Sequence, residues 1–275
     1  MPQSAFLLRF HGIGFSQSAL KVIVEPMLTR TEFHKLFKAP GPVVLPVIHV
    51  LDPARTADNI AKVIEGGAQG CFLINHDFEM EGLLPILREM RALYPSLWMG
   101  VNFLAVTGRE AFPVLGELKA QGCDIDAYWA DDARVDEDGD TREVEEIAMA
   151  RVRSGWNGLY FGGTAFKKQR HVDPSRFGDA ARGACPYMDV ITTSGVATGQ
   201  EADLGKLETF REAIGDRPMA LASGITPENA LSYSDVDCFM VATGINAPGN
   251  FYDIDLERLK RLTALCREIG KGGVT

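Results

Sequence analysis

The stretch VVLPVIHVLDPARTADNIAKVIEGGAQGCFLIN, residues 43–75, sets the pattern that the rest of the chain repeats. It holds an apolar run at 43–50, a turn around Asp52-Pro53, an amphipathic segment at 56–65 and a second apolar run at 70–75. Short apolar runs that alternate with helical segments are typical of βαβ units, in which a helix joins two parallel strands. The stretch therefore predicts one such unit.

The pattern continues to the end of the chain. The predicted strands are 43–50, 70–75, 97–103, 125–130, 158–161, 188–193, 219–222 and 238–242. The predicted helices are 56–65, 83–93, 109–120, 143–153, 174–182, 204–214, a short one from 227, and 256–269. Eight strand–helix units in about 230 residues match the size of a (β/α)8 barrel. We therefore predict a single-domain α/β protein, with an N-terminal extension at 1–41 and the barrel at 42–275.

Two further features support a barrel over an open doubly wound sheet. Glycines follow several predicted helices, where they supply the left-handed residue that ends a helix. They are Gly66-Gly67, Gly122, Gly155 and Gly215. An open sheet usually carries GxGxxG after its first strand, whereas Leu51-Asp52-Pro53 follows the first strand here.

The composition limits the class of protein. A hydrophobic content of 46% with 24% charged residues is typical of a globular chain with a large core. The net charge of −9 disfavours binding to nucleic acid or to an anionic membrane. No apolar stretch approaches the roughly 20 residues of a membrane span. The five cysteines include no CxxC pair, which favours a reducing cytoplasm over a disulfide framework or a zinc site.

The N-terminal extension admits several interpretations. Residues 1–26 have no acidic residue before Glu25, which faintly resembles a transit peptide. A loose tail, or a true start at Met27, is favoured because termini are commonly loose. The segment 1–41 could also cover the bottom of the barrel or contact a second subunit of a homo-oligomer.

Polar residues follow the predicted strands. In a barrel these positions form one ring at the face where active sites lie. The residues are His49; Asn75, His76 and Asp77; Asn102; Asp131, Asp132 and Arg134; Thr164 and Lys167; Thr193 and Ser194; Ser223; and Thr243. So many polar groups at one face favour an enzyme.

The last three loops predict a phosphate site. Small residues let backbone N–H groups approach an anion closely, and barrels commonly hold phosphate after strands seven and eight. The candidate binding residues are Ser194, Gly195, Ser223, Gly224, Thr243, Gly244, Lys167 and Asn102. Alternatively, Ser223-Gly224 and Thr243-Gly244 are ordinary turns with a helix N-cap, and Lys167 is a solvated surface lysine.

The candidate catalytic residues are Asp131, Asp132, His76 and His49. Two adjacent carboxylates in a cleft repel each other, which raises one pKa towards the range useful to a general base. Alternatively, Asp132 pairs with Arg134 or faces solvent, and each histidine is structural. Asn75, His76 and Asp77, with Asp131, could also hold a divalent metal ion.

The chain also resembles a known family. Its runs Thr193-Ser194-Gly195 to Thr198-Gly199, Ala222 to Asn229 and Val241 to Gly244 are similar to those of the BtpA/SgcQ family, as is Leu45 to Val50. The resemblance covers about residues 40–270 and implies a barrel similar to the ribulose-phosphate-binding barrels. The chain departs from the family at Asn246, where a lysine is usual, and at 74–78 and 129–134.

The resulting hypothesis is an enzyme that acts on a phosphorylated sugar or phosphoribosyl compound by acid–base isomerisation, lyase or glycosyl-bond chemistry. The resemblance also implies an alternative, a non-catalytic assembly factor of the kind that supports photosystem I biogenesis. A metal-dependent barrel hydrolase is a third hypothesis, disfavoured because the first strand has His49 but no HxH.

Overall fold

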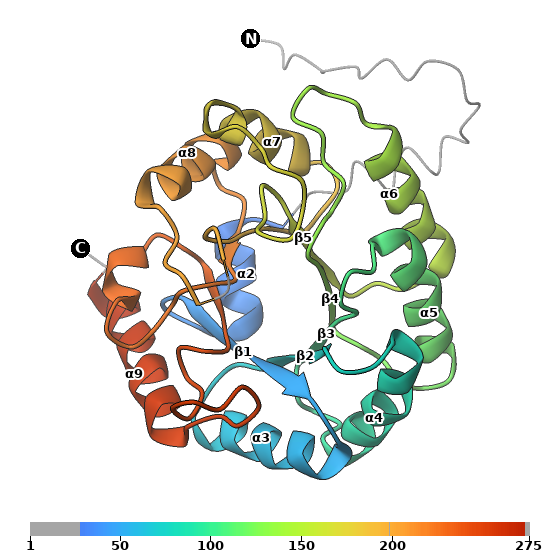
Figure 1. Cartoon of the computed structure of the whole chain (residues 1–275), viewed down its shortest axis with the longest axis vertical. Helices are drawn as coiled ribbons and strands as arrows, with labels where there is room; N and C mark the ends of the chain where they lie inside the picture. The colour runs from blue at the N-terminus through green and yellow to red at the C-terminus, as the bar shows by residue number, and fades with distance from the viewer. Residues whose placement is uncertain (1–27, 198, 273–275) are drawn as a thin grey trace.

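The predicted barrel is confirmed. The computed structural model describes residues 28–197 and 199–272, and in it eight parallel strands close in the order β1 to β8. Helices surround the strands as a ring (Figure 1). The interpretations of residues 1–26 as a tail or transit peptide, and of Met27 as the start, lie outside the described residues.

The elements follow the predicted order. The strands are β1 Val43–Val50, β2 Cys71–Asn75, β3 Met99–Asn102, β4 Ala127–Ala130, β5 Leu159–Gly163, β6 Val190–Thr193, β7 Met219–Leu221 and β8 Cys238–Val241. The α-helices are α2 Arg30–Phe37, α3 Pro53–Glu65, α4 Met80–Leu93, α5 Gly108–Ala120, α6 Arg142–Ser154, α7 Phe177–Ala184, α8 Leu204–Ile214 and α9 Leu256–Gly272, with 3₁₀ turns η1 Pro174–Arg176 and η2 Ala230–Tyr233. Among the described residues, no helix is both long and apolar enough to cross a membrane.

The glycines after the helices have the expected role. Gly67, Gly122, Gly155 and Gly215 all have positive φ, between 59° and 82°. Ordinary side chains strain that conformation, so glycine ends these helices at little cost.

Alternate residues of each strand face the two sides of the barrel wall. Val44, Ile48 and Val50 of β1 join the larger core between strands and helices. Val43 and Val47 join a second core inside the barrel. This period of two is the ordinary geometry of a strand, and it decides which residues after each strand can reach the barrel axis.

Helix α2 closes the N-terminal end of the barrel. In Figure 1, which looks down the barrel, α2 lies inside the ring of the other helices. Its Phe33 and Phe37 are buried in the inner core, and Phe37 packs edge-on to Trp98 at 5.0 Å between ring centroids. Residues 30–37 of the predicted extension therefore complete the barrel core.

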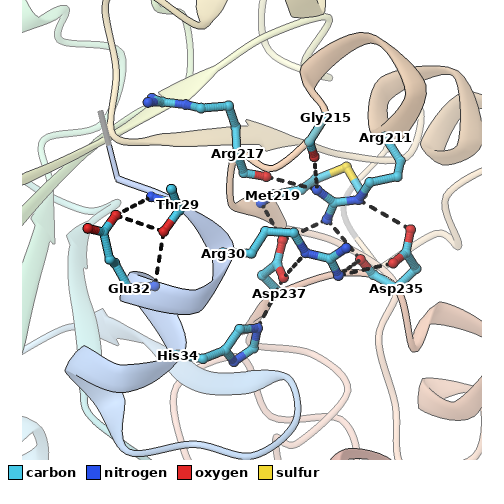
Figure 2. A network of polar contacts seen from close by, with 10 residues as sticks. All are labelled: Thr29, Arg30, Glu32, His34, Arg211, Gly215, Arg217, Met219, Asp235 and Asp237. Atoms are coloured by element: carbon cyan, nitrogen blue, oxygen red, sulfur yellow. Dashed lines mark hydrogen bonds and ion pairs between the residues drawn. The ribbon is translucent and has the colours of Figure 1, made fainter. Parts of the chain in front are cut away.

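A buried carboxylate fastens α2 to the strands (Figure 2). Asp237, just before β8, accepts hydrogen bonds from Arg30 Nε at 2.8 Å and His34 Nε2 at 3.0 Å through Oδ1. Its Oδ2 accepts from Arg211 at 2.6 Å and from the Met219 backbone N–H at 2.9 Å. Burial alone would raise the pKa of Asp237, but the His34 hydrogen bond and the charges of Arg211 and Arg30 lower it to about 2.

Candidate functional site

A cavity of about 240 Å³ opens where the strands end at their carboxyl side. It is lined by Val47, His49, Ile74, His76, Trp129, Asp131, Lys167, Lys168, Gly199, Ala222, Ser223, Gly224, Ile225, Met240, Val241, Ala242, Thr243, Gly244 and Phe251. These residues come from seven of the eight strands and the loops that follow them, so only the closed barrel brings them together. The lining combines apolar side chains with the ionisable groups of His49, His76, Asp131, Lys167 and Lys168.

Strand periodicity explains which polar residues reach this cavity. His49 continues the inward series of β1 after Val47, and Asp131 continues that of β4 after Trp129. His76 follows Ile74 of β2 in the same way. Residues two apart on an extended chain share a face, so these three side chains turn towards the barrel axis.

Asp131 is a buried carboxyl group with one free oxygen. Its side chain accepts a hydrogen bond from Asn102 Nδ2 at 3.2 Å through Oδ1. Within residues 28–197 and 199–272, its Oδ2 has no partner, and neither do Asn102 Oδ1 and Trp129 Nε1. Burial raises the pKa of Asp131, partly offset by the charge of Lys168 and the Asn102 hydrogen bond. A carboxyl group held in this way can exchange a proton with a bound molecule.

Asp132 does not share the cavity with Asp131. It points to the opposite side of the chain, where its Oδ1 accepts a hydrogen bond from the Arg134 backbone at 2.8 Å. Its other oxygen forms a 3.4 Å ion pair with Arg134 Nε. The pair lines a separate charged surface hollow. The pKa of Asp131 is raised chiefly by burial, with Asp132 a minor contributor, so the predicted carboxylate repulsion is not the main cause.

His49 lies under the loop that follows β8. Its ring stacks on Phe251 at 3.9 Å between centroids, and His76 lies edge-on at 4.9 Å. Burial, together with the charges of His76 and Lys168, lowers the pKa of His49 to about 4. His49 Nδ1 lies 3.0 Å from the Phe251 carbonyl, which can only accept. The ring is therefore neutral near pH 7, with Nδ1 protonated and Nε2 free to accept a proton.

Two lysines after β5 differ in their surroundings. Lys167 is partly buried, and its Nζ donates to the Ala222 carbonyl at 2.8 Å. Burial lowers the pKa of Lys167 to about 8, although the charge of Asp131 opposes this. Lys168 is exposed at the rim of the same cavity. The cavity is thus lined by one exposed lysine, Lys168, and by one partly buried lysine, Lys167, whose lowered pKa lets it lose its proton more easily.

The residues predicted to bind phosphate fall into three groups. Ser223, Gly224, Thr243, Gly244 and Lys167 line the cavity. Ser194 and Gly195 line a neighbouring hollow. Asn102 lies beneath the cavity, fully buried against Asp131.

Hydrogen bonds from the second group hold the loops together. Ser194 Oγ accepts from the Lys167 backbone at 2.9 Å, and Ser223 Oγ accepts from the Gly195 backbone at 2.6 Å. These serines therefore join the loops after β5, β6 and β7. In the described part of the chain, the backbone N–H groups of Ser223, Gly224, Thr243 and Gly244 donate to no protein acceptor. Four unpaired donors at a cavity rim are suited to an anion.

Close packing requires glycine in these loops whatever they bind. Gly224 has a φ of 71°, and a Cβ there would lie 2.3 Å from the Gln200 carbonyl oxygen. A Cβ on Gly244 would lie 1.8 Å from the Ile225 carbonyl oxygen. The Ser-Gly and Thr-Gly pairs thus have a structural role as well as free backbone donors.

The residues suggested as metal ligands are not arranged as a ligand set. The amide of Asn75 donates to the Phe78 carbonyl at 2.6 Å and accepts from the Leu104 backbone at 3.0 Å. Asp77 turns outwards and accepts from the Tyr252 hydroxyl at 3.0 Å. In the residues that the structure describes, no group of three or more His, Cys, Asp or Glu side chains is placed to hold a metal ion.

Several cavity residues were missed by reasoning from the sequence, and three of them show why. Trp129 shares the inward series of Asp131 and could have been found by counting two residues back. Lys168 differs from Lys167 only in exposure, which the sequence does not reveal. Phe251 belongs to a long loop whose path over His49 depends on the antiparallel bridge between Asn246 and Ile254.

The fold is similar to solved barrels at low sequence identity. The tryptophan synthase α chain from Legionella pneumophila subsp. pneumophila has 15% identity and a TM-score of 0.58, with 90% of this chain and 99% of that chain covered. The phosphoribosyl anthranilate isomerase from Thermus thermophilus has 16% identity and a TM-score of 0.51, with 81% and 96% covered. A native KDPGal structure has 11% identity and a TM-score of 0.56, with 83% and 96% covered.

At these identities the likeness shows the (β/α)8 fold alone. No family model and no curated protein matches the chain. The resemblance to the BtpA/SgcQ family accordingly remains an interpretation of the loop motifs.

Proposed function

We propose that this protein is an enzyme that binds a phosphorylated sugar or phosphoribosyl compound in the cavity at the carboxyl end of its barrel. The phosphate would meet the unpaired backbone donors of Ser223, Gly224, Thr243 and Gly244, with Lys168 as a nearby positive charge. This agrees with the position, after strands seven and eight, where barrels commonly hold phosphate. The fold of the neighbours and the BtpA-like loops support the same substrate class without defining the reaction.

The observation that carries the proposal is that one cavity holds both backbone N–H donors and a carboxyl oxygen for which the described residues provide no hydrogen-bond partner. Free N–H donors line one side, and the buried Asp131 carboxyl lines the other with an unpaired oxygen. An unsatisfied buried polar atom such as Asp131 Oδ2 costs free energy in a folded protein, so its place in a cavity favours a functional reason.

Acid–base chemistry follows from the same groups. Asp131 would act as a proton donor or acceptor, since burial raises its pKa. His49, neutral and with Nε2 free, would act as a second acceptor, and His76 stands beside it. Proton transfer by positioned groups of this kind contributes about 10²–10⁴ in rate, which suits isomerase or lyase chemistry on a sugar phosphate.

Thermal unfolding with and without phosphate compounds tests the binding. Inorganic phosphate, ribose 5-phosphate and ribulose 5-phosphate should each stabilise the protein. A ligand at about 100 times its Kd adds about 2.7 kcal/mol, a rise of a few degrees in Tm for a chain of this size. Thr243→Glu, at an exposed position on the rim, should abolish the rise through charge repulsion.

The matched control is Ser232→Glu, which adds the same charge to an exposed residue of η2 away from the cavity. It should keep the full phosphate-dependent rise. If no phosphate compound raises the Tm of the folded protein, the proposal is wrong and the assembly-factor alternative gains weight.

A further inference from the structure

Lys167 is held in place within the cavity. Its backbone N–H donates to Ser194 Oγ at 2.9 Å, and its Nζ donates to the Ala222 carbonyl at 2.8 Å. The Nζ also lies 5.4 Å from the centroid of the Phe166 ring. These hydrogen bonds hold both the backbone of Lys167 and its amine, so the amine lies at the cavity wall and not in solvent like that of a surface lysine.

The amine has no carboxylate partner. Among the described residues Lys167 forms no ion pair within 4.0 Å, and neither does Asp131, although both line the cavity. Oppositely charged groups in one partly buried cavity attract each other. Here Ala222 holds the amine and Asn102 holds the carboxyl, so the two groups remain apart with space between them.

The neighbouring lysines show what is particular to Lys167. Lys168 is exposed at the rim. Lys206 is also buried, but its Nζ donates to two carbonyls, of Ala165 at 2.6 Å and Ser194 at 2.8 Å, and it does not line this cavity. Only Lys167, of these three, combines restricted solvent access with a position facing the cavity.

We propose that the Lys167 amine is a nucleophile that forms an imine with the carbonyl carbon of the bound substrate, and that Asp131 is the acid that releases water. This inference deepens the proposed function and rests on it. It narrows the substrate to a phosphorylated compound with a ketone or aldehyde group, short enough for the carbonyl to reach Lys167 while the phosphate meets the loops after β7 and β8.

The step balances without an added reactant. The neutral amine adds to the carbonyl carbon, a C–N bond forms, and the oxygen takes up the proton that the nitrogen loses. Asp131 then gives a proton to that hydroxyl group, which leaves as water while the nitrogen lone pair forms the C=N⁺ bond. The Asp131 carboxylate that remains can remove a proton from the adjacent carbon, because the iminium group acidifies it.

The electrostatics agree with these roles. Burial lowers the pKa of Lys167 to about 8, so the amine loses its proton at a lower pH than an ordinary lysine does. Burial raises the pKa of Asp131, so it retains its proton to a higher pH than an ordinary aspartate. The first shift favours the neutral amine that the addition needs, and the second favours the protonated acid that the release of water needs.

Borohydride trapping tests the imine directly. The full chain would be incubated with dihydroxyacetone phosphate, ribulose 5-phosphate or pyruvate, reduced with sodium borohydride, and mapped by peptide mass spectrometry. We expect a single reduced adduct on Lys167 with at least one of these carbonyl compounds. Its rate of formation should rise between about pH 6 and about pH 8.5 as the amine loses its proton.

Two charge-conserving variants provide the control. Lys167→Arg keeps a cation but cannot form an imine, and it should lower adduct formation at least about twentyfold. Lys35→Arg, at an exposed lysine of α2 at the opposite end of the barrel, should keep it within about twofold. Adducts spread over surface lysines, or equal labelling in both variants, would overturn the inference.

The outcomes also separate this inference from the proposed function. If inorganic phosphate raises the Tm but no carbonyl compound labels Lys167, the phosphate site stands and Lys167 acts only as a cation. If pyruvate labels Lys167 but no phosphate compound stabilises the protein, the nucleophile stands and the phosphate site is wrong.

Discussion

At the N-terminal end of the barrel both oxygens of Asp237 accept hydrogen bonds, whereas at the C-terminal end one oxygen of Asp131 has no partner in the described chain. Both carboxyl groups are buried. Two arginines and a histidine lower the pKa of Asp237 to about 2, despite its burial. Burial raises the pKa of Asp131, which faces only an amide and more distant lysines.

The difference teaches how the same side chain serves two purposes. A buried carboxylate surrounded by cations contributes to stability, and removing it leaves those cations unpaired. A buried carboxyl group without a cation costs stability, and its raised pKa is a feature that functional sites often share. In barrels generally, the N-terminal face contributes to stability and the C-terminal face carries the active site. The comparison of Asp237 with Asp131 agrees with this division.

The largest expected effect is a loss of stability when the Asp237 carboxylate is removed from the N-terminal end of the barrel. Asp237→Ala removes the shared partner of Arg30 and Arg211 and should lower the free energy of unfolding by about 3–5 kcal/mol. Urea denaturation at pH 7 would measure it. The control is Asp235→Ala, which removes an exposed ion pair to the same arginines and should cost at most about 1 kcal/mol. Equal costs for the two variants would contradict the account of this network in Figure 2.

Much of the fold could be predicted from the sequence. The strand–helix alternation that begins at Val43 indicates parallel strands, and eight repeats favour the closed barrel that the structure shows. The role of α2 could not be predicted in the same way. Phe33 and Phe37 alone show a short apolar face, and the site that receives them exists only once Trp98 and Phe161 have assembled inside the barrel.

The position of the cavity could be predicted from the sequence, but its detailed geometry could not. The rule that polar residues at strand ends converge applied to Asp131, His49 and His76, which all line the cavity. It could not separate Asp131 from Asp132, because adjacency in sequence conceals that neighbouring residues point to opposite faces. The sequence also could not show that burial, more than repulsion from Asp132, raises the pKa of Asp131. That burial depends on the packing of distant strands.

A smaller effect on stability is expected from removing the charge of Asp131 at the C-terminal end of the barrel. Asp131→Asn should raise the free energy of unfolding at pH 8 and leave it nearly unchanged near pH 4. The folded pKa of Asp131 is raised, so the folded state binds the proton more tightly than the unfolded state does. Stability from this group is therefore present at low pH and is lost as pH rises through the folded pKa. Asp237 acts in the opposite sense, and its contribution is lost only as pH falls through about 2.

Paired denaturation curves at pH 4 and pH 8 measure this effect. Asp132→Asn, in its separate hollow, is the matched control and should change neither curve in this way. The same Asp131→Asn variant should lose deuterium exchange from solvent into any bound sugar phosphate by at least about 100-fold. A variant that keeps full exchange would remove Asp131 from the proton transfer while leaving the binding site intact.

The smallest effect concerns the loop that covers His49. Phe251→Ala removes the ring stacked on the imidazole but keeps the backbone carbonyl that accepts from Nδ1. Burial is the main reason why the pKa of His49 is about 4, so the variant should raise it towards 6.5. An NMR titration of the histidine ring protons, assigned with His49→Gln, would measure the change, and Tyr252→Phe would serve as the control. In the native protein, stability from the neutral His49 is lost as pH falls from 6.5 through about 4, and Phe251→Ala should reduce that loss. A pKa that stays near 4 would mean that the barrel wall, and not the loop after β8, keeps water from this part of the cavity.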